Sequence, residues 1–111
     1  MKSLIHITSP VVAYKIEQEG FIPFNISKYK YYSDMGLGGI YFYDNLRLAQ
    51  FYAYHFASKN KIDKVAVIRC EAPDNIIQSN NKLEDGLFIA TDNLNKVVIT
   101  SIDYKFPRDI Y

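Results

Sequence analysis

A chain of 111 residues, 49% apolar and 23% charged, has the size and composition of one soluble globular domain. Its net charge of +1 excludes a domain-wide attraction to nucleic acid or anionic lipid. The lone Cys70 excludes a disulfide framework and a cluster of thiolate metal ligands, and its apolar surroundings in the sequence predict an inert core thiol. Aromatic residues reach 15%, with ten Tyr and seven Phe, so some of these rings are candidates for a binding site.

The N-terminal part of the chain predicts a strand, a helix and a second strand. Ser3–Thr8 is rich in β-forming residues and predicts the first strand. Ser9 and Pro10 are typical of a helix start, because serine caps free N–H groups and proline suits the first helical position. Gly20 is typical of a helix end, and Phe21–Asn25 predicts the second strand. The helix's apolar face is expected to carry Val11, Val12, Tyr14, Lys15 and Ile16.

A long irregular segment, residues 26–38, comes next and is typical of a lid or a binding loop. Gly39–Tyr43 predicts the third strand, and Asp44 or Asn45 is expected to cap a helix that runs to about Lys59. The apolar residues of this helix recur at helical spacing: Leu46, Ala49, Tyr52, Ala53, Phe56 and Ala57.

The second half of the chain predicts three more strands, Lys64–Glu71, Leu87–Thr91 and Val97–Phe106. About six strands stand against two helices, and both helices fall in the first half. We therefore predict a single α+β domain over residues 1–111, built on a mixed, split β-sheet. No apolar run is long enough to span a membrane and the N-terminus lacks a secretory segment, so we expect a cytoplasmic protein.

Two pairs of residues are candidates for a binding site. His6 and Thr8 lie two residues apart in a strand and so point to the same side, where His6 can bind a ribose hydroxyl and Thr8 a neighbouring amide. Tyr41 ends a strand and Tyr52 lies about two turns into the following helix, so the two rings can flank a flat ligand. Such stacking contributes on the order of 1–3 kcal/mol per ring. Taken alone, Tyr52 also fits the helix's core stripe, and His6 also fits a surface histidine or a satisfied core histidine.

Together these features resemble the ADP-ribosyltransferase fold, and most of all the catalytic domain of the poly(ADP-ribose) polymerases. That family's signature Gly-x-Gly-Ile-Tyr-Phe-Ala-Asp is similar to Gly36-Leu37-Gly38-Gly39-Ile40-Tyr41-Phe42-Tyr43-Asp44. The family's second tyrosine, eleven residues later, matches Tyr52, and its opening His-x-Ser/Thr matches His6-Ile7-Thr8. The resemblance covers roughly Ile5 to Phe56, and the second half agrees only in the order of its elements.

The resemblance implies a site for NAD, which is the substrate of this family. His6 would bind the ribose next to adenine, the Ile7 backbone would hold the carboxamide, and Tyr41 and Tyr52 would flank the nicotinamide. Residues 26–37 would cover NAD. The other residues counted with the cofactor site are Thr8, Ala49 and Lys28, with Lys30 as a further candidate for the pyrophosphate.

The resemblance also implies an acid at the start of the penultimate strand, where it stabilises the cation-like transition state as nicotinamide leaves. Asp85 and Glu84 stand just before Gly86-Leu87-Phe88, with Asp85 slightly better placed and Glu71 a more distant possibility. An acidic pair before a strand is also common in solvated turns. Loss of the acid leaves a mono-transferase that works by other means, or a binder without turnover.

The function implied is NAD-dependent mono-ADP-ribosylation of a macromolecule, a protein or possibly a nucleic acid, by a toxin or a phage anti-defence factor. The tRNA 2′-phosphotransferases share the His-x-Thr opening but use several arginines, and this chain has only Arg47, Arg69 and Arg108. A non-enzymatic alternative is an interaction or inhibitor protein that keeps the same fold.

In the non-enzymatic alternative, Tyr29, Tyr31 and Tyr32 are candidate anchors for a partner or for single-stranded nucleic acid. A metal site is not expected, because His6 and His55 are the only histidines and lack ligand spacing.

Overall fold

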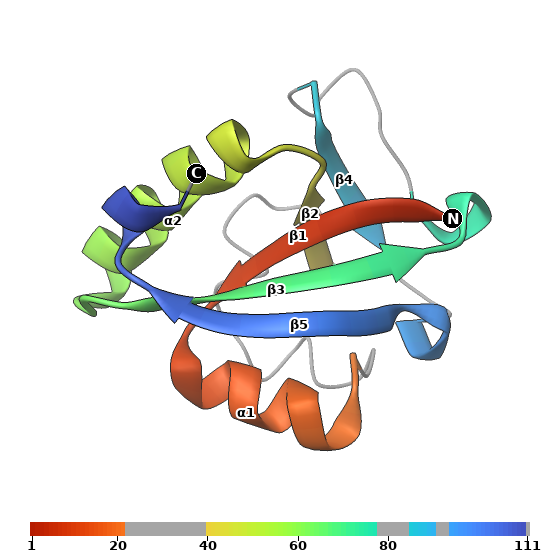
Figure 1. Cartoon of the computed structure of the whole chain (residues 1–111), viewed down its shortest axis with the longest axis horizontal. Helices are drawn as coiled ribbons and strands as arrows, with labels where there is room; N and C mark the ends of the chain where they lie inside the picture. The colour runs from red at the N-terminus through yellow and green to blue at the C-terminus, as the bar shows by residue number, and fades with distance from the viewer. Residues whose placement is uncertain (22–39, 78–84, 91–93, 111) are drawn as a thin grey trace.

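The protein is described by a computed structural model in which residues 1–21, 40–77, 85–90 and 94–110 are described (Figure 1). In chain order the main elements are β1 (Lys2–Thr8), α1 (Pro10–Glu19), β2 (Ile40–Tyr43), α2 (Leu46–Asn60), β3 (Val65–Ala72), β4 (Leu87–Ala90) and β5 (Val98–Lys105). Three short 3-10 turns accompany them: η3 (Asp74–Ile76), η4 (Leu94–Lys96) and η5 (Pro107–Asp109). No helix within these described ranges is long and apolar enough to cross a membrane.

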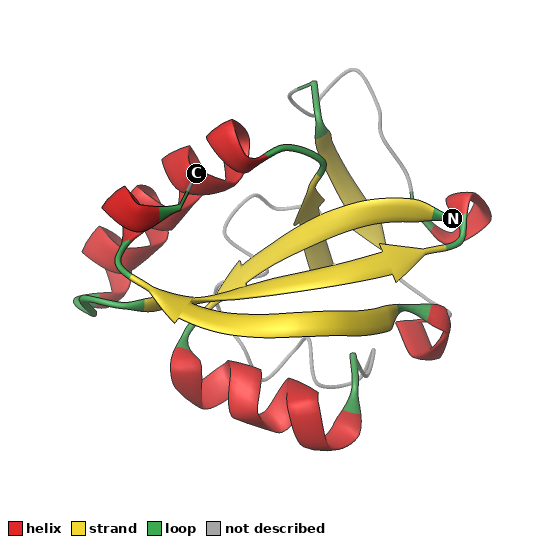
Figure 2. Cartoon of the chain, viewed as in Figure 1, coloured by secondary structure: helices red, strands yellow, loops and turns green. Residues whose placement is uncertain are grey.

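The described strands form one five-stranded sheet in the order β4-β2-β1-β3-β5 (Figure 2). Every pairing between these strands is antiparallel, so the α+β class is confirmed and the prediction of a mixed sheet is wrong for the described part. In the described part of the chain each strand runs opposite to its neighbours in the sheet, and no two neighbouring strands are joined by a parallel crossover. The predicted strand Phe21–Asn25 lies, apart from Phe21, outside the described residues.

The pairing between β1 and β2 is much shorter than the pairings on either side of it. β1 pairs with β3 along its whole length, from Lys2↔Ala72 to Thr8↔Ala66, and β2 pairs with β4 from Ile40↔Ala90 to Tyr43↔Leu87. Among the described residues, β1 and β2 share only the register pair Ile5↔Tyr43. Figure 1 shows β2 and β4 crossing β1 steeply on the far side. The two motif-bearing strands therefore meet at one point and diverge from it.

Helix α1 begins and ends as its sequence predicts. The Ser9 hydroxyl accepts a hydrogen bond from the Val12 amide, Pro10 occupies the first turn, and Gly20 ends the helix with a φ of 75°. The predicted apolar face is only partly right, because Val12, Ala13 and Ile16 are buried. Val11 and Tyr14, which were expected on that face, are 72% and 63% exposed.

Helix α2 is capped by Asn45, whose side-chain oxygen accepts from the Leu48 amide at 2.8 Å, and it ends at Lys61 in the left-handed conformation. Ala49, Ala53 and Ala57 are fully or nearly fully buried against the sheet, as the helical spacing predicts. Small side chains on this face let the helix backbone approach the strands closely.

The two helices lie on opposite faces of the sheet and close two separate parts of the core (Figure 1). Facing α1 are Leu4, Phe42, Ile68 and Cys70 among others, and burial raises the pKa of the Cys70 thiol to about 12. The alternate residues of the same strands face α2, including Ile5, Ile7, Val65 and Val67.

Candidate functional site

His6 lies inside the core on the α1 side of β1. Its side chain is 2% exposed, and its ring contacts those of Phe21, edge-on at 5.4 Å, and Phe42 at 5.7 Å between centroids. Thr8, two residues later on the same strand, is fully buried. The residues proposed to bind a ribose and an amide are thus packed within the protein in this conformation.

The His6 imidazole joins the two diverging strands. Its Nδ1 lies 2.7 Å from the Tyr41 carbonyl oxygen, and because a carbonyl only accepts, Nδ1 carries the proton and donates. Burial lowers the pKa of His6 to about 4, and the hydrogen bond to Tyr41 offsets this only in part. His6 is therefore neutral at pH 7.

The tyrosines of β2 project to the opposite face, toward α2. Tyr41 and Tyr43 are 6% and 8% exposed and pack in the same part of the core as Ala49 and Ala53. Because side chains alternate along a strand, Phe42 between them faces His6 instead. The imidazole of His6 and the ring of Tyr41 consequently lie on different faces of the sheet, although their residues are hydrogen-bonded.

The ring that lies against Tyr52 is that of Tyr43. The two rings stack with centroids 5.0 Å apart and an interplanar angle of 16°. Two rings that held a third flat ring between them would be about 7 Å apart, since each aromatic contact needs about 3.5 Å. The sequence predicts that Tyr41 and Tyr52 flank a ligand. In this structure the ring that faces Tyr52 is that of Tyr43, and no third ring fits between Tyr43 and Tyr52.

The remaining predicted residues have different placements. The Ile7 side chain is buried among the residues that face α2, and its Cα pairs with that of Val67. Ala49 is a fully buried core residue of α2. Glu84 and Lys28, together with residues 26–38 and their tyrosines, lie outside the described residues.

Asp85 is exposed and lies in the turn before β4, beside the junction of β2 and α2. The next residue, Gly86, has a φ of 90° and its carbonyl accepts from the Asp44 amide at 2.9 Å. A Cβ on Gly86 would lie 2.7 Å from Asp44 Oδ1 and 2.9 Å from Asn45 Nδ2. Glycine thus permits the close approach that places the Asp85 turn against the start of α2.

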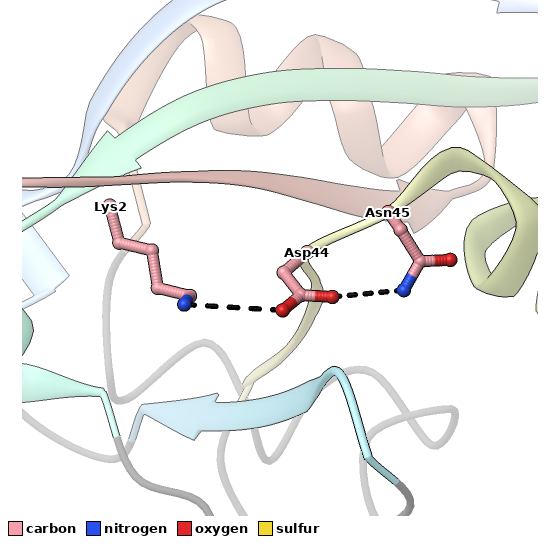
Figure 3. Close-up of polar contacts among 3 residues, drawn as sticks. All are labelled: Lys2, Asp44 and Asn45. Atoms are coloured by element: carbon pink, nitrogen blue, oxygen red, sulfur yellow. Dashed lines mark hydrogen bonds and ion pairs between the residues drawn. The ribbon is translucent and has the colours of Figure 1, made fainter.

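An open polar pocket of about 290 Å³ lies over the part of the α2-facing surface that α2 does not cover. Its lining includes Ser3 and Ile5 of β1, Arg69 and Glu71 of β3, and Asp44 and Asn45 at the start of α2. At its wall, the Asp44 carboxylate accepts from Asn45 Nδ2 at 2.9 Å and lies 3.9 Å from Lys2 Nζ (Figure 3).

The sequence of β3 carries a signal for this pocket. In β3 the apolar run breaks at Arg69 and again at Glu71, two residues apart, which indicates one face turned to solvent. Across the described ranges, no three His, Cys, Asp or Glu side chains group closely enough to hold a metal ion.

Comparisons with known proteins add no family to this geometry. No protein-family model matches the chain, and neither a curated protein nor a solved structure matches it. The resemblance to ADP-ribosyltransferases therefore rests on the motifs in the sequence.

Proposed function

We propose that this chain is an NAD-dependent mono-ADP-ribosyltransferase that modifies a cytoplasmic macromolecule, as a toxin or a phage anti-defence factor does. The observation that carries the proposal is the 2.7 Å contact between His6 Nδ1 and the Tyr41 carbonyl. It brings the strand with the His-x-Thr motif against the strand with the Gly-Ile-Tyr-Phe motif. The helix that follows carries Tyr52 back to β2, where its ring stacks on Tyr43 and not on Tyr41, the ring that the resemblance implies.

The residues do not fit NAD in the conformation described. Tyr43 and Tyr52 are in direct contact, and His6 is 2% exposed. The proposal therefore requires the Tyr52 ring to leave Tyr43 before a nicotinamide ring can lie beside the tyrosines. Tyr52 is only partly buried and belongs to a helix whose contact with the sheet is made mainly by alanines, so this ring is the member of the pair that can move.

Asp85 is the acid that this proposal uses. It is exposed, and the close contact of Gly86 with the β2–α2 junction holds its turn near Tyr43, which pairs with Leu87. A carboxylate there is available to a ligand that reaches the tyrosines from solvent. The acceptor would be a macromolecule, a protein or a nucleic acid, that approaches from the same open side.

The test is transfer of labelled ADP-ribose from NAD to macromolecules of a cell extract. We expect transfer by the natural chain and a reduction of about 10²-fold or more in Asp85→Asn, because one electrostatic stabiliser of the transition state is removed. Asp103→Asn, an exposed carboxylate on β5, is the matched control and should keep full activity. Absence of transfer by the natural chain, together with absence of NAD binding by calorimetry, contradicts the proposal.

A second candidate is a non-catalytic interaction or inhibitor protein of the same fold. It is favoured by the direct stacking of Tyr43 on Tyr52 and by the burial of His6, because these proposed NAD-binding groups then contact the core and not a ligand. This candidate predicts that the chain inhibits its partner in the absence of NAD and that Tyr41→Ala, where it folds, keeps the inhibition. Loss of inhibition when NAD is removed contradicts it.

A further inference from the structure

The outer face of α2 is aromatic and basic. Taking 100° per residue, Arg47, Phe51, Tyr54 and Ser58 fall on one stripe that points away from the buried Ala49, Ala53 and Ala57. Phe51 is 63% exposed and Tyr54 is 52% exposed, which is unusual for rings of this size in a core-forming helix.

The charged residues of α2 are all positive. Within Leu46–Asn60 the charged residues are Arg47 and Lys59, with no Asp or Glu, although the chain as a whole has twelve acidic residues. Lys61 follows at the end of the helix. The local charge is thus positive on a protein whose total charge is only +1.

The turn η5 brings one cation, Arg108, and one exposed carboxylate, Asp109, beside α2. Gln50 Nε2 donates to the carbonyl oxygens of Pro107 and Arg108, which holds η5 against the helix. The Arg108 guanidinium and the Lys64 ammonium both lie over the Phe106 ring, at 4.7 and 5.1 Å from its centroid. Among the described residues, neither Arg47 nor Arg108 forms an ion pair, so both can meet an external anion.

We propose that the outer face of α2 together with η5, defined by Arg47, Phe51, Tyr54, Lys61 and Arg108, binds single-stranded nucleic acid. Exposed rings offer stacking platforms to unpaired bases, and the cations around them meet the phosphates. One edge of Phe51 contacts Tyr52, 5.3 Å between centroids, and the ring remains 63% exposed and open to a base. This surface adjoins the proposed NAD site at the contact between Phe51 and Tyr52 but shares no residue with it.

Single-stranded nucleic acid fits this face better than a lipid surface. A membrane-binding helix turns a broad apolar face to the bilayer. Here the broad apolar face of α2 is already buried against the sheet, and the outer stripe carries the rings of Phe51 and Tyr54 between Arg47 and Ser58. Isolated rings among cations match bases alternating with phosphates.

The test is fluorescence anisotropy with a labelled oligodeoxythymidine of about 15 nucleotides, in the absence of NAD. We expect binding at about 50 mM salt, and a loss of affinity of about tenfold in each of Phe51→Ala and Tyr54→Ala. Arg47→Gln should reduce the slope of log affinity against log salt by roughly one. Tyr14→Ala removes an equally exposed ring from α1 and is the matched control, with no expected change.

Four results overturn the inference: no binding at about 50 mM salt, equal loss of affinity in Tyr14→Ala, tighter binding to the corresponding duplex, or binding to anionic vesicles alone. The substituted rings are exposed, so each variant is expected to fold, and circular dichroism is the check. Because NAD is absent, failure of this test leaves the transfer proposal standing, and failure of ADP-ribose transfer leaves this one standing.

Discussion

The two faces of the sheet use polar residues in opposite ways. On the α1 face, His6 and Thr8 are enclosed with Leu4, Phe42 and the apolar side of α1. On the α2 face, the helix covers only one part of the strands, and Arg69 and Glu71 line an open pocket beyond it. A polar strand residue is thus buried in the core where a helix covers it, and is open to a ligand where no helix does.

The largest effect is expected from removing His6. His6→Ala deletes a buried ring and the hydrogen bond that it donates to the Tyr41 carbonyl, so we predict a loss of about 3 kcal/mol in the free energy of unfolding at pH 7. His55→Ala, on the exposed side of α2, should change it by less than about 0.5 kcal/mol. Urea denaturation measures both. Equal small effects would place His6 at the surface and contradict the enclosed α1 face.

The protonation of His6 should make stability depend on pH. With a folded pKa near 4 and an unfolded value of 6.5, the unfolded chain binds more protons between these values, so stability is present above pH 6.5 and falls as the pH is lowered toward 4. We predict a loss of about 2 kcal/mol between pH 7 and pH 4.5 from this residue. The comparison is with His6→Gln, whose amide does not titrate and can donate to the same carbonyl. An identical pH dependence in both chains would contradict a buried neutral imidazole.

A smaller effect is expected where α2 covers the sheet. Tyr52→Ala removes a half-buried ring that stacks on Tyr43, so we predict a loss of about 1–2 kcal/mol in the free energy of unfolding. Tyr54→Ala removes a ring two residues later that is 52% exposed, and a change below about 0.5 kcal/mol is expected. Thermal or urea unfolding distinguishes them. If Tyr54→Ala were the more damaging change, the orientation of α2 on the sheet would be wrong.

The smallest effect is expected in the open pocket. Arg69 is exposed and makes no ion pair with any residue in the described part of the chain. Arg69→Gln should therefore leave the free energy of unfolding within about 0.5 kcal/mol of its natural value. A loss above about 2 kcal/mol, measured by the same denaturation, would mean that Arg69 belongs to the core. The two faces of the sheet would then not differ in how they use polar residues.

The sequence predicted the elements of the fold well, because their signals are local. Ser9 and Pro10 begin α1, Gly20 ends it, and the Ala49–Ala53–Ala57 spacing identifies the buried side of α2. The antiparallel order of the sheet was missed, since pairing depends on contacts between strands far apart in the chain. The sequence left open whether His6 is a ligand-binding or a core residue for the same reason: what covers a strand is decided by the helix that packs on it.

The candidate NAD site stays a prediction; the structure shows that the His6 strand meets the Tyr41 strand. The sequence offered Tyr41 as the partner of Tyr52. It did not distinguish Tyr41 from Tyr43, because both point to the same face and only the offset of α2 along the strand decides which ring meets Tyr52. The polar residues Arg69 and Glu71 indicate that one face of β3 meets solvent, but the extent of the pocket depends on how much of the sheet α2 leaves uncovered.

Proton–proton NOEs between the aromatic rings of Tyr43 and Tyr52, recorded with and without saturating nicotinamide or NAD, test the proposed function most directly. In the free protein these NOEs should be strong, since the centroids are 5.0 Å apart. The proposal predicts that the ligand weakens them and gives new NOEs from its pyridine ring to Tyr52. Unchanged Tyr43–Tyr52 NOEs and no ligand contact at millimolar concentration would contradict an NAD site at these tyrosines.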